Sequence, residues 1–137
     1  MSTVEHDILR DAADAVAAAR IAARVRFDRD EGALEPGDCI VWMDQVEYEP
    51  QAGRSAVIAA NIDIEWMPRG PWSELDYHAQ LAALDAEIMG VLGAYGATPL
   101  MARVLRAESG GYLVLREYRI LYHRDMLSVE GVIRTEV

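Results

Sequence analysis

Residues 55–76, SAVIAANIDIEWMPRGPWSELD, contain the clearest structural pattern in the chain. From residue 58 to residue 66 every second side chain is apolar, and from residue 61 the side chains between them are polar. The apolar set is Ile58, Ala60, Ile62, Ile64 and Trp66, and the polar set is Asn61, Asp63 and Glu65. Successive side chains of a strand point to opposite faces. The alternation therefore predicts a strand with one buried face and one face in water.

Two segments have the spacing of amphipathic helices. The first extends from about Thr3 to about Ala19; Ser2 and Glu5 have capping-box spacing, and its buried face is rich in alanine. The second begins after Ser73, which has capping spacing with Asp76. Its apolar face consists of Tyr77, Leu81, Leu84, Ile88, Val91 or Leu92, and Tyr95. Gly93 and Gly96, with Pro99 beyond them, end this helix.

The other strand-like segments are IAARVRFD (21–28), DCIVWMDQVEYEP (38–50), LMARVLRAE (100–108) and YLVLREYRILYHRD (112–125). The expected order is helix, three strands, helix, two strands. Strands joined by short loops are most simply antiparallel, and two helices can cover one face of such a sheet. We therefore predict an α+β fold, a mainly antiparallel sheet of four or five strands with two helices packed on one face.

Length and composition restrict the kind of protein. A chain of 137 residues is long enough for one modest core, so we expect a single domain over 1–126 and a C-terminal extension over 127–137. The formal net charge of −10 argues against clamping onto a nucleic-acid backbone. The single Cys39 lies in an apolar run and is expected to be buried. No stretch approaches the roughly 20 apolar residues that span a bilayer. The N-terminus does not have the order of a signal peptide, so we expect cytoplasmic assembly.

Arrangements that support catalysis are not evident in the sequence. His6, His78 and His123 fall on three different elements. Asp63 and Glu65 could in principle hold a metal, but carboxylates on one face of a strand are usually just exposed. Asp44, Glu47 and Glu49 are interpreted as a solvated rim. We therefore expect no enzyme activity, no metal and no cofactor.

The order of these elements and several local motifs resemble one family. The motifs are a strand ending at Phe27-Asp28, a strand led by Pro36 and continuing through CIVWMDQVEYEP, then AANIDIEWMPRGPWSELD running into a long helix, and a final EYRILYHRDM strand. From about Val4 to Met126 the chain resembles the tail terminator proteins of long-tailed bacteriophages, also called tail completion or lambda-like minor tail proteins. The SELD opening of the second helix carries the closest local likeness.

The resemblance implies a virion structural protein, located in the tail or neck and assembled in the host bacterial cytoplasm. Such proteins form a ring, typically of six copies, on the end of the tail tube. The implied partners are further copies of the chain, the major tail tube protein and the head-closure or connector protein. DNA passes through the ring without specific binding, and no membrane or cofactor is involved. On this interpretation Asn61, Asp63 and Glu65 line the bore, or else lie on the outer surface.

The loop after the alternating strand is a candidate subunit or partner interface. Its residues Trp66, Met67, Pro68, Arg69 and Trp72 are of types enriched at interfaces. The alternative is a rigid loop whose two tryptophans pack into the core.

Two other functions remain open. One is a different neck or connector protein of the virion. The other is a stand-alone α+β module that binds a small molecule, or an enzyme, with a pocket lined by Trp42, Trp66 or Tyr118.

The last segment, LSVEGVIRTEV (127–137), has too few apolar residues to bury themselves. Chain termini that are not tied down are usually mobile. We expect this segment to be poorly ordered in an isolated subunit and to become ordered against a neighbour's sheet edge.

Overall fold

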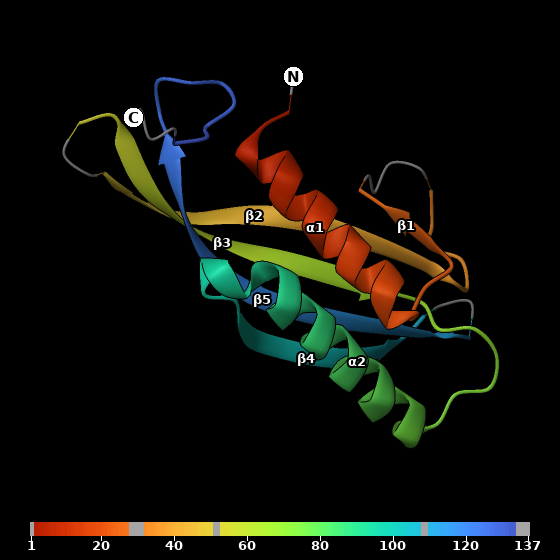
Figure 1. Ribbon diagram of the computed structural model, residues 1–137. Helices are drawn as coiled ribbons and strands as arrows, with labels where there is room; N and C mark the ends of the chain where they lie inside the picture. The colour runs from red at the N-terminus through yellow and green to blue at the C-terminus, as the bar shows by residue number, and fades with distance from the viewer. Residues whose placement is uncertain (1, 28–31, 51–52, 108–109, 134–137) are drawn as a thin grey trace.

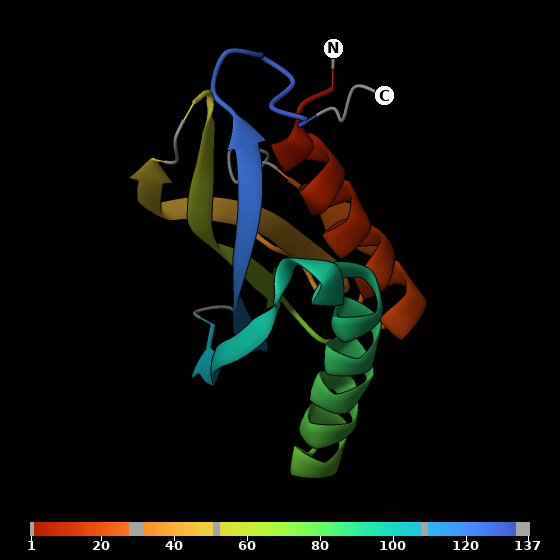
Figure 2. The ribbon, with the colours of Figure 1, turned by 60° about the vertical axis from the view of Figure 1, so that its left-hand side comes forward.

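The computed structural model describes residues 2–27, 32–50, 53–107 and 110–133. The elements are α1 (Val4–Ala19), β1 (Arg24–Arg26), β2 (Asp38–Pro50), β3 (Ser55–Trp66), α2 (Glu74–Leu92), the short 3₁₀ helix η2 (Gly93–Tyr95), β4 (Thr98–Arg106) and β5 (Tyr112–Asp125). In the described residues they form one sheet with the strand order β1-β2-β3-β5-β4. Both long helices lie on the same side of this sheet (Figures 1 and 2). The predicted α+β class with two helices and a mostly antiparallel sheet is confirmed.

The sheet is mixed because β1 pairs with β2 in parallel, whereas the other three pairs are antiparallel. The sequence did not predict this parallel pair. Arg24 lies opposite Asp38 and makes a bidentate ion pair with its carboxylate, at 3.0 and 2.9 Å. Of the described residues of the expected strand over 21–28, only Arg24–Arg26 form a strand, and residue 28 lies outside the described residues. The apolar Phe27 is 52% exposed, whereas Arg26 is only 4% exposed because its guanidinium lies against the carbonyls of residues 32 and 33.

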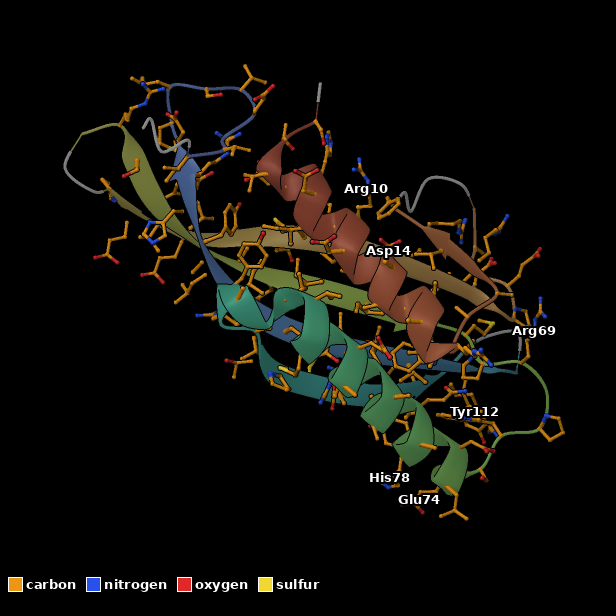
Figure 3. The ribbon with its side chains drawn as sticks, viewed as in Figure 1. Arg10, Asp14, Arg69, Glu74, His78 and Tyr112 are labelled. Carbon is orange, nitrogen blue, oxygen red and sulfur yellow. The ribbon has the colours of Figure 1, made fainter. Side chains whose placement is uncertain are left out.

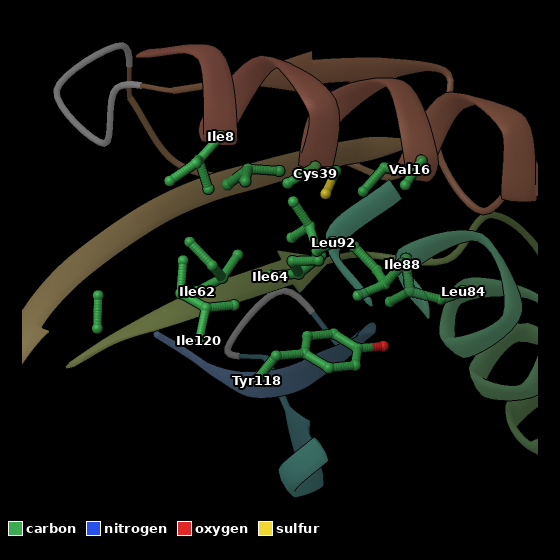
Figure 4. Packing of buried hydrophobic residues seen from close by; sticks show 14 of the residues in the cluster. Ile8, Val16, Cys39, Ile62, Ile64, Leu84, Ile88, Leu92, Tyr118 and Ile120 are labelled. Atoms are coloured by element: carbon green, nitrogen blue, oxygen red, sulfur yellow. The ribbon is translucent and has the colours of Figure 1, made fainter. Parts of the chain in front are cut away.

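The central strand β3 has the predicted alternation. Its apolar set, Ile58, Ala60, Ile62, Ile64 and Trp66, is fully buried toward the helices. Figure 4 shows Ile62 and Ile64 packed with Ile8 and Val16 of α1. Leu84, Ile88 and Leu92 of α2 and Tyr118 and Ile120 of β5 complete this part of the core. Burying one such aliphatic side chain is worth about 1.5–3 kcal/mol, so this layer dominates the stability of the fold. Cys39 lies within it, and burial raises the pKa of its thiol to about 12.

Both helices begin with a capping box. At α1 the box uses Thr3 and His6 rather than the predicted Ser2 and Glu5, so that prediction is off by one residue. At α2 the predicted pair is confirmed: the Ser73 side chain accepts from the Asp76 amide, and the Ser73 amide donates to Asp76. The spacing left open whether Val91 or Leu92 belongs to the buried face of α2. Leu92 is buried and Val91 is exposed, so Leu92 belongs to it.

The C-terminal segment is held against the body over residues 127–133. The Val4 amide donates to the Glu130 carbonyl at 2.7 Å, and the Asp125 amide donates to the Gly131 carbonyl at 2.9 Å. Arg124 donates to the carbonyls of Ser128 and Val129 and also contacts Glu5. Backbone bonds over 127–133 take the place of the missing apolar burial, and the expected poor order in an isolated subunit stays a prediction. Residues 134–137 lie outside the described residues.

Deleting residues 127–137 is expected to lower the free energy of unfolding by about 2 kcal/mol. The deletion removes acceptors for Val4 and Arg124, and each such hydrogen bond contributes about 1 kcal/mol. Thermal unfolding followed by circular dichroism measures this change. The control is Val129→Ser, which changes an exposed side chain and leaves the backbone bonds in place. An unchanged melting temperature in the truncated chain would show that these contacts contribute nothing to the isolated subunit.

Candidate functional site

The sheet face turned away from the helices carries most of the candidate residues, and we call it the open sheet face. On β3 it presents Asn61, Asp63 and Glu65, which alternate with the buried set. Across the β3–β5 pair these residues lie opposite Arg119, Glu117 and Leu115. Across the β2–β3 pair they lie opposite Asp44, Trp42 and Ile40. The predicted orientation of Asn61, Asp63 and Glu65 is confirmed, although their side chains are half-buried and not fully solvated.

A pair of carboxyl groups occupies the middle of the open sheet face. Asp63 and Glu117 are direct cross-strand partners, and their carboxyl groups are hydrogen-bonded to each other. Burial, followed by the negative charges of Glu117 and Asp44, raises the pKa of Asp63 to about 7. The Asn61 side-chain amide donates to Glu117 at 2.9 Å, and Arg119 donates to the Asn61 oxygen at 3.4 Å. Asp63 therefore retains its proton to a higher pH than an ordinary aspartate.

A small hollow of about 140 Å³ lies beside this pair. Its lining includes Trp42 from β2, Glu65 from β3, Met101 from β4 and Leu115 from β5. Pockets that hold small-molecule ligands are usually about 300–1,000 Å³. The hollow is therefore too small to serve as a substrate pocket.

The expected interface in the loop after β3 is wrong for Trp66, Met67 and Pro68, which are buried within the chain itself. The Trp66 indole N–H donates to Gln80 of α2 at 2.8 Å. Trp72 is half-buried, and its ring packs against Tyr77 and Tyr112. The alternative of a tryptophan packed into the core is confirmed for Trp66, while Trp72 packs against the core only in part.

Arg69 is the exposed member of the proposed interface set and lies at the same end of the molecule as Tyr112 (Figure 3). Its guanidinium covers Gly37, where a Cβ would come within 2.4 Å of Nε. Gly37 has a φ of +92°, so both the backbone conformation and the close approach require glycine there. Arg69 therefore has a structural contact within the chain.

Sequence reasoning missed a polar cluster on the helix side of the sheet. Arg116 of β5 makes a bidentate contact with Asp85 of α2, at 3.0 and 2.6 Å. The Tyr118 hydroxyl donates to the same carboxylate, and burial raises the pKa of that hydroxyl. The two-residue spacing of Arg116 and Tyr118 places both on one face of β5, but only the packing of α2 shows that Asp85 meets them. The cluster fastens α2 to the sheet.

The three histidines are not brought together. The His6 ring accepts from the Thr3 amide at the α1 cap, and His78 lies 3.6 Å from Glu74 on the outer end of α2 (Figure 3). His123 is exposed on β5. Across the described residues no group of three or more histidine, cysteine or acidic side chains is arranged to hold a metal ion.

The aromatic pocket considered for a small-molecule module does not extend to Trp66 and Tyr118, which are fully buried core residues. Trp42 lines the small hollow. A wider, shallow hollow of about 660 Å³ lies near the β2–β3 turn, between Tyr48, Ala56 and Leu127. Its described lining is mainly apolar, and among those residues there is no convergent set of polar groups that would orient a ligand.

Neither α1 nor α2 has the length and apolarity needed to cross a bilayer, and these are the long helices of the described residues. In the comparisons with known proteins, no family model matches the chain and no curated protein sequence matches it.

The variant Asp63→Asn is expected to stabilise the protein by about 0.5–1 kcal/mol at pH 8, because it removes one of two like charges that lie directly opposite. The folded protein retains the Asp63 proton up to about pH 7, whereas the unfolded chain releases it near pH 4. Wild-type stability should therefore fall as the pH rises through this window. The variant should show a smaller fall, measured by urea unfolding at pH 5 and pH 8.

The matched control is Glu49→Gln, an exposed carboxyl at the far end of β2. It should leave the pH dependence unchanged. Equal slopes for Asp63→Asn and the wild type would contradict the raised pKa of Asp63.

Proposed function

We propose that this chain is a virion structural protein: a tail terminator of a long-tailed bacteriophage. It forms a ring on the tail tube, ends tube polymerisation and provides the surface that joins tail to head. The observation that carries the proposal is the open sheet face, an acidic surface left uncovered by both helices. The resemblance of element order and motifs over residues 4–126 supports it as well.

The open sheet face suits the wall of a DNA channel. Asp44, Asp63, Glu65 and Glu117 lie on it beside Arg103 and Arg119, so its acidic side chains outnumber its basic ones, and the chain as a whole carries a formal charge of −10. A negative wall repels the phosphate backbone, so DNA slides past without binding. A surface built to hold nucleic acid would need the opposite charge.

The proposed partners follow from the same role. Further copies of the chain form the ring, the major tail tube protein contacts one rim, and the head-closure or connector protein contacts the other. No cofactor takes part. A small-molecule module or enzyme has less support, because neither hollow combines adequate size with polar groups that converge.

The first test is assembly of the purified chain. We expect closed rings, with six copies as the principal species, in native mass spectrometry and negative-stain images. Rings form because head-to-tail contacts between two different patches close a cycle. A two-fold dimer that persists at all concentrations would overturn the proposal.

The second test changes the charge of the proposed channel wall. The double variant Asp63→Arg with Glu65→Arg should fold, because both side chains lie on the open sheet face and the arginine introduced at position 63 would face Glu117. Particles that carry it should assemble yet inject DNA poorly, since a cationic wall holds phosphate. Infectivity per assembled particle is the measurement.

The matched control reverses the charge of two exposed acidic side chains on the helices, Asp14→Arg with Glu74→Arg (Figure 3). It introduces the same charge on the other side of the sheet and should leave infectivity unchanged. Normal infectivity in the double variant of β3 would remove the channel-wall assignment.

A further inference from the structure

Within the described part of the chain, both sides of the sheet have an edge with no neighbouring strand. β4 is the last strand on one side, so its outer edge is open. On the other side β1 pairs only with Asp38, Cys39 and Ile40 of β2, which leaves the outer edge of residues 41–50 without a strand. Figure 1 shows β2 and β4 on opposite sides of the sheet. An open edge presents a row of backbone N–H and C=O groups that another strand can pair with.

Apart from the charges of Arg103 and Arg106, the β4 edge has little of the usual protection against pairing. It is nine residues long, and Leu100, Val104 and Leu105 on it are exposed. Natural edge strands that avoid partners are typically short, bulged, or carry lysine or proline along their length. β4 has its proline, Pro99, near its start, and the shift in its pairing register follows directly, between Pro99 and Met101. The stretch from Met101 to Arg106 therefore resembles an edge that receives a strand.

The charges of the two edges are complementary. Arg103 of β4 lies opposite Leu115, which in turn lies opposite Glu65, so Arg103 belongs to the open sheet face. Its side chain is exposed and makes no ion pair within the described residues. On β2, Asp44 and Glu47 lie opposite Asn61 and Ala59, which places them on the same face. Both of these carboxyls are exposed.

We propose that the outer edge of β4 pairs with the outer edge of β2 in a second copy of this chain, head to tail, with Arg103 beside Asp44 and Glu47. The strand directions fit this arrangement. β2, β3, β5 and β4 are successive antiparallel neighbours, so β4 runs opposite to β2. A second copy that continues the sheet in the same orientation therefore presents β2 antiparallel to β4.

Pairing an edge with itself is disfavoured by the same charges. Two β4 edges would bring Arg103 and its symmetry mate to one interface, and two β2 edges would bring the four carboxyls of Asp44 and Glu47 together. Juxtaposed like charges of this kind are unfavourable. The head-to-tail pairing uses two different patches and can therefore add copies until a ring closes. Its biological use rests on the proposed tail terminator role, and it provides an interface that does not need the buried Trp66, Met67 and Pro68.

The test is a charge exchange between the two edges of the full-length chain. The first variant is Arg103→Glu, and the second is Asp44→Arg with Glu47→Arg. Each variant alone should self-associate at least about tenfold more weakly than the wild type, because like charges then face each other across the interface. An equimolar mixture should regain association, with the two variants alternating in the assemblies. Sedimentation velocity over a concentration series and native mass spectrometry measure both effects.

The matched control is Arg10→Glu on the outer surface of α1 (Figure 3), which should associate as the wild type does. Circular dichroism melts confirm that all variants fold. A wild type that stays monomeric up to millimolar concentration, or variants that associate like the wild type, would overturn the edge pairing.

The outcomes separate this inference from the proposed function. Closed rings that persist in both variants would reject the edge pairing and leave the terminator role standing. Open chains that respond to the charge exchange but never close would support the edge pairing and reject the ring.

Discussion

The two-residue period of β3 is the constraint on which the rest of the structure depends. β3 is the middle strand of the sheet, so its buried side chains contact both helices and both neighbouring strands. A slip of one residue in its pairing would turn Asp63 toward the core and Ile62 and Ile64 toward water. Each buried aliphatic is worth about 1.5–3 kcal/mol, and an unpaired buried charge costs several more. This difference fixes the register, and with it the side on which the helices pack.

Polar anchors then fix how the second helix lies on that layer. The Trp66 indole N–H donates a hydrogen bond to Gln80. The Asp85 carboxylate accepts hydrogen bonds from Arg116 and Tyr118 of β5. These contacts join α2 to both central strands, and apolar packing alone would specify its position less uniquely. The same anchors use Trp66 within the fold, so Trp66 is not available to a partner.

The sequence predicted those features that depend on local spacing. The alternation of β3, the capping of α2 by Ser73 and Asp76, and the single-sided placement of the helices follow from period and cap chemistry. The features that it missed depend on pairing between distant segments. Arg26 is buried only because Asp38 and the carbonyls of residues 32 and 33 surround it. The pairing of β5 with β3, and its register, likewise decide that Asp63 lies opposite Glu117. The apolar count of residues 127–133 could not reveal their backbone bonds to Val4 and Asp125.

The open sheet face carries an electrostatic cost that folding alone does not require. A neutral or oppositely charged partner opposite Asp63 would pair more favourably than Glu117 does. Features that lower stability in this way are concentrated at functional surfaces. The cost also connects the two proposals, because Asp44 contributes to the field that holds the proton on Asp63 and is one of the carboxyls assigned to the β2 edge. An arginine from a second copy beside Asp44 would weaken that field and favour ionised carboxylates on the same face. Assembly would then make the channel wall more fully charged than the face of an isolated subunit, and by linkage a rise in pH through the Asp63 titration would favour assembly.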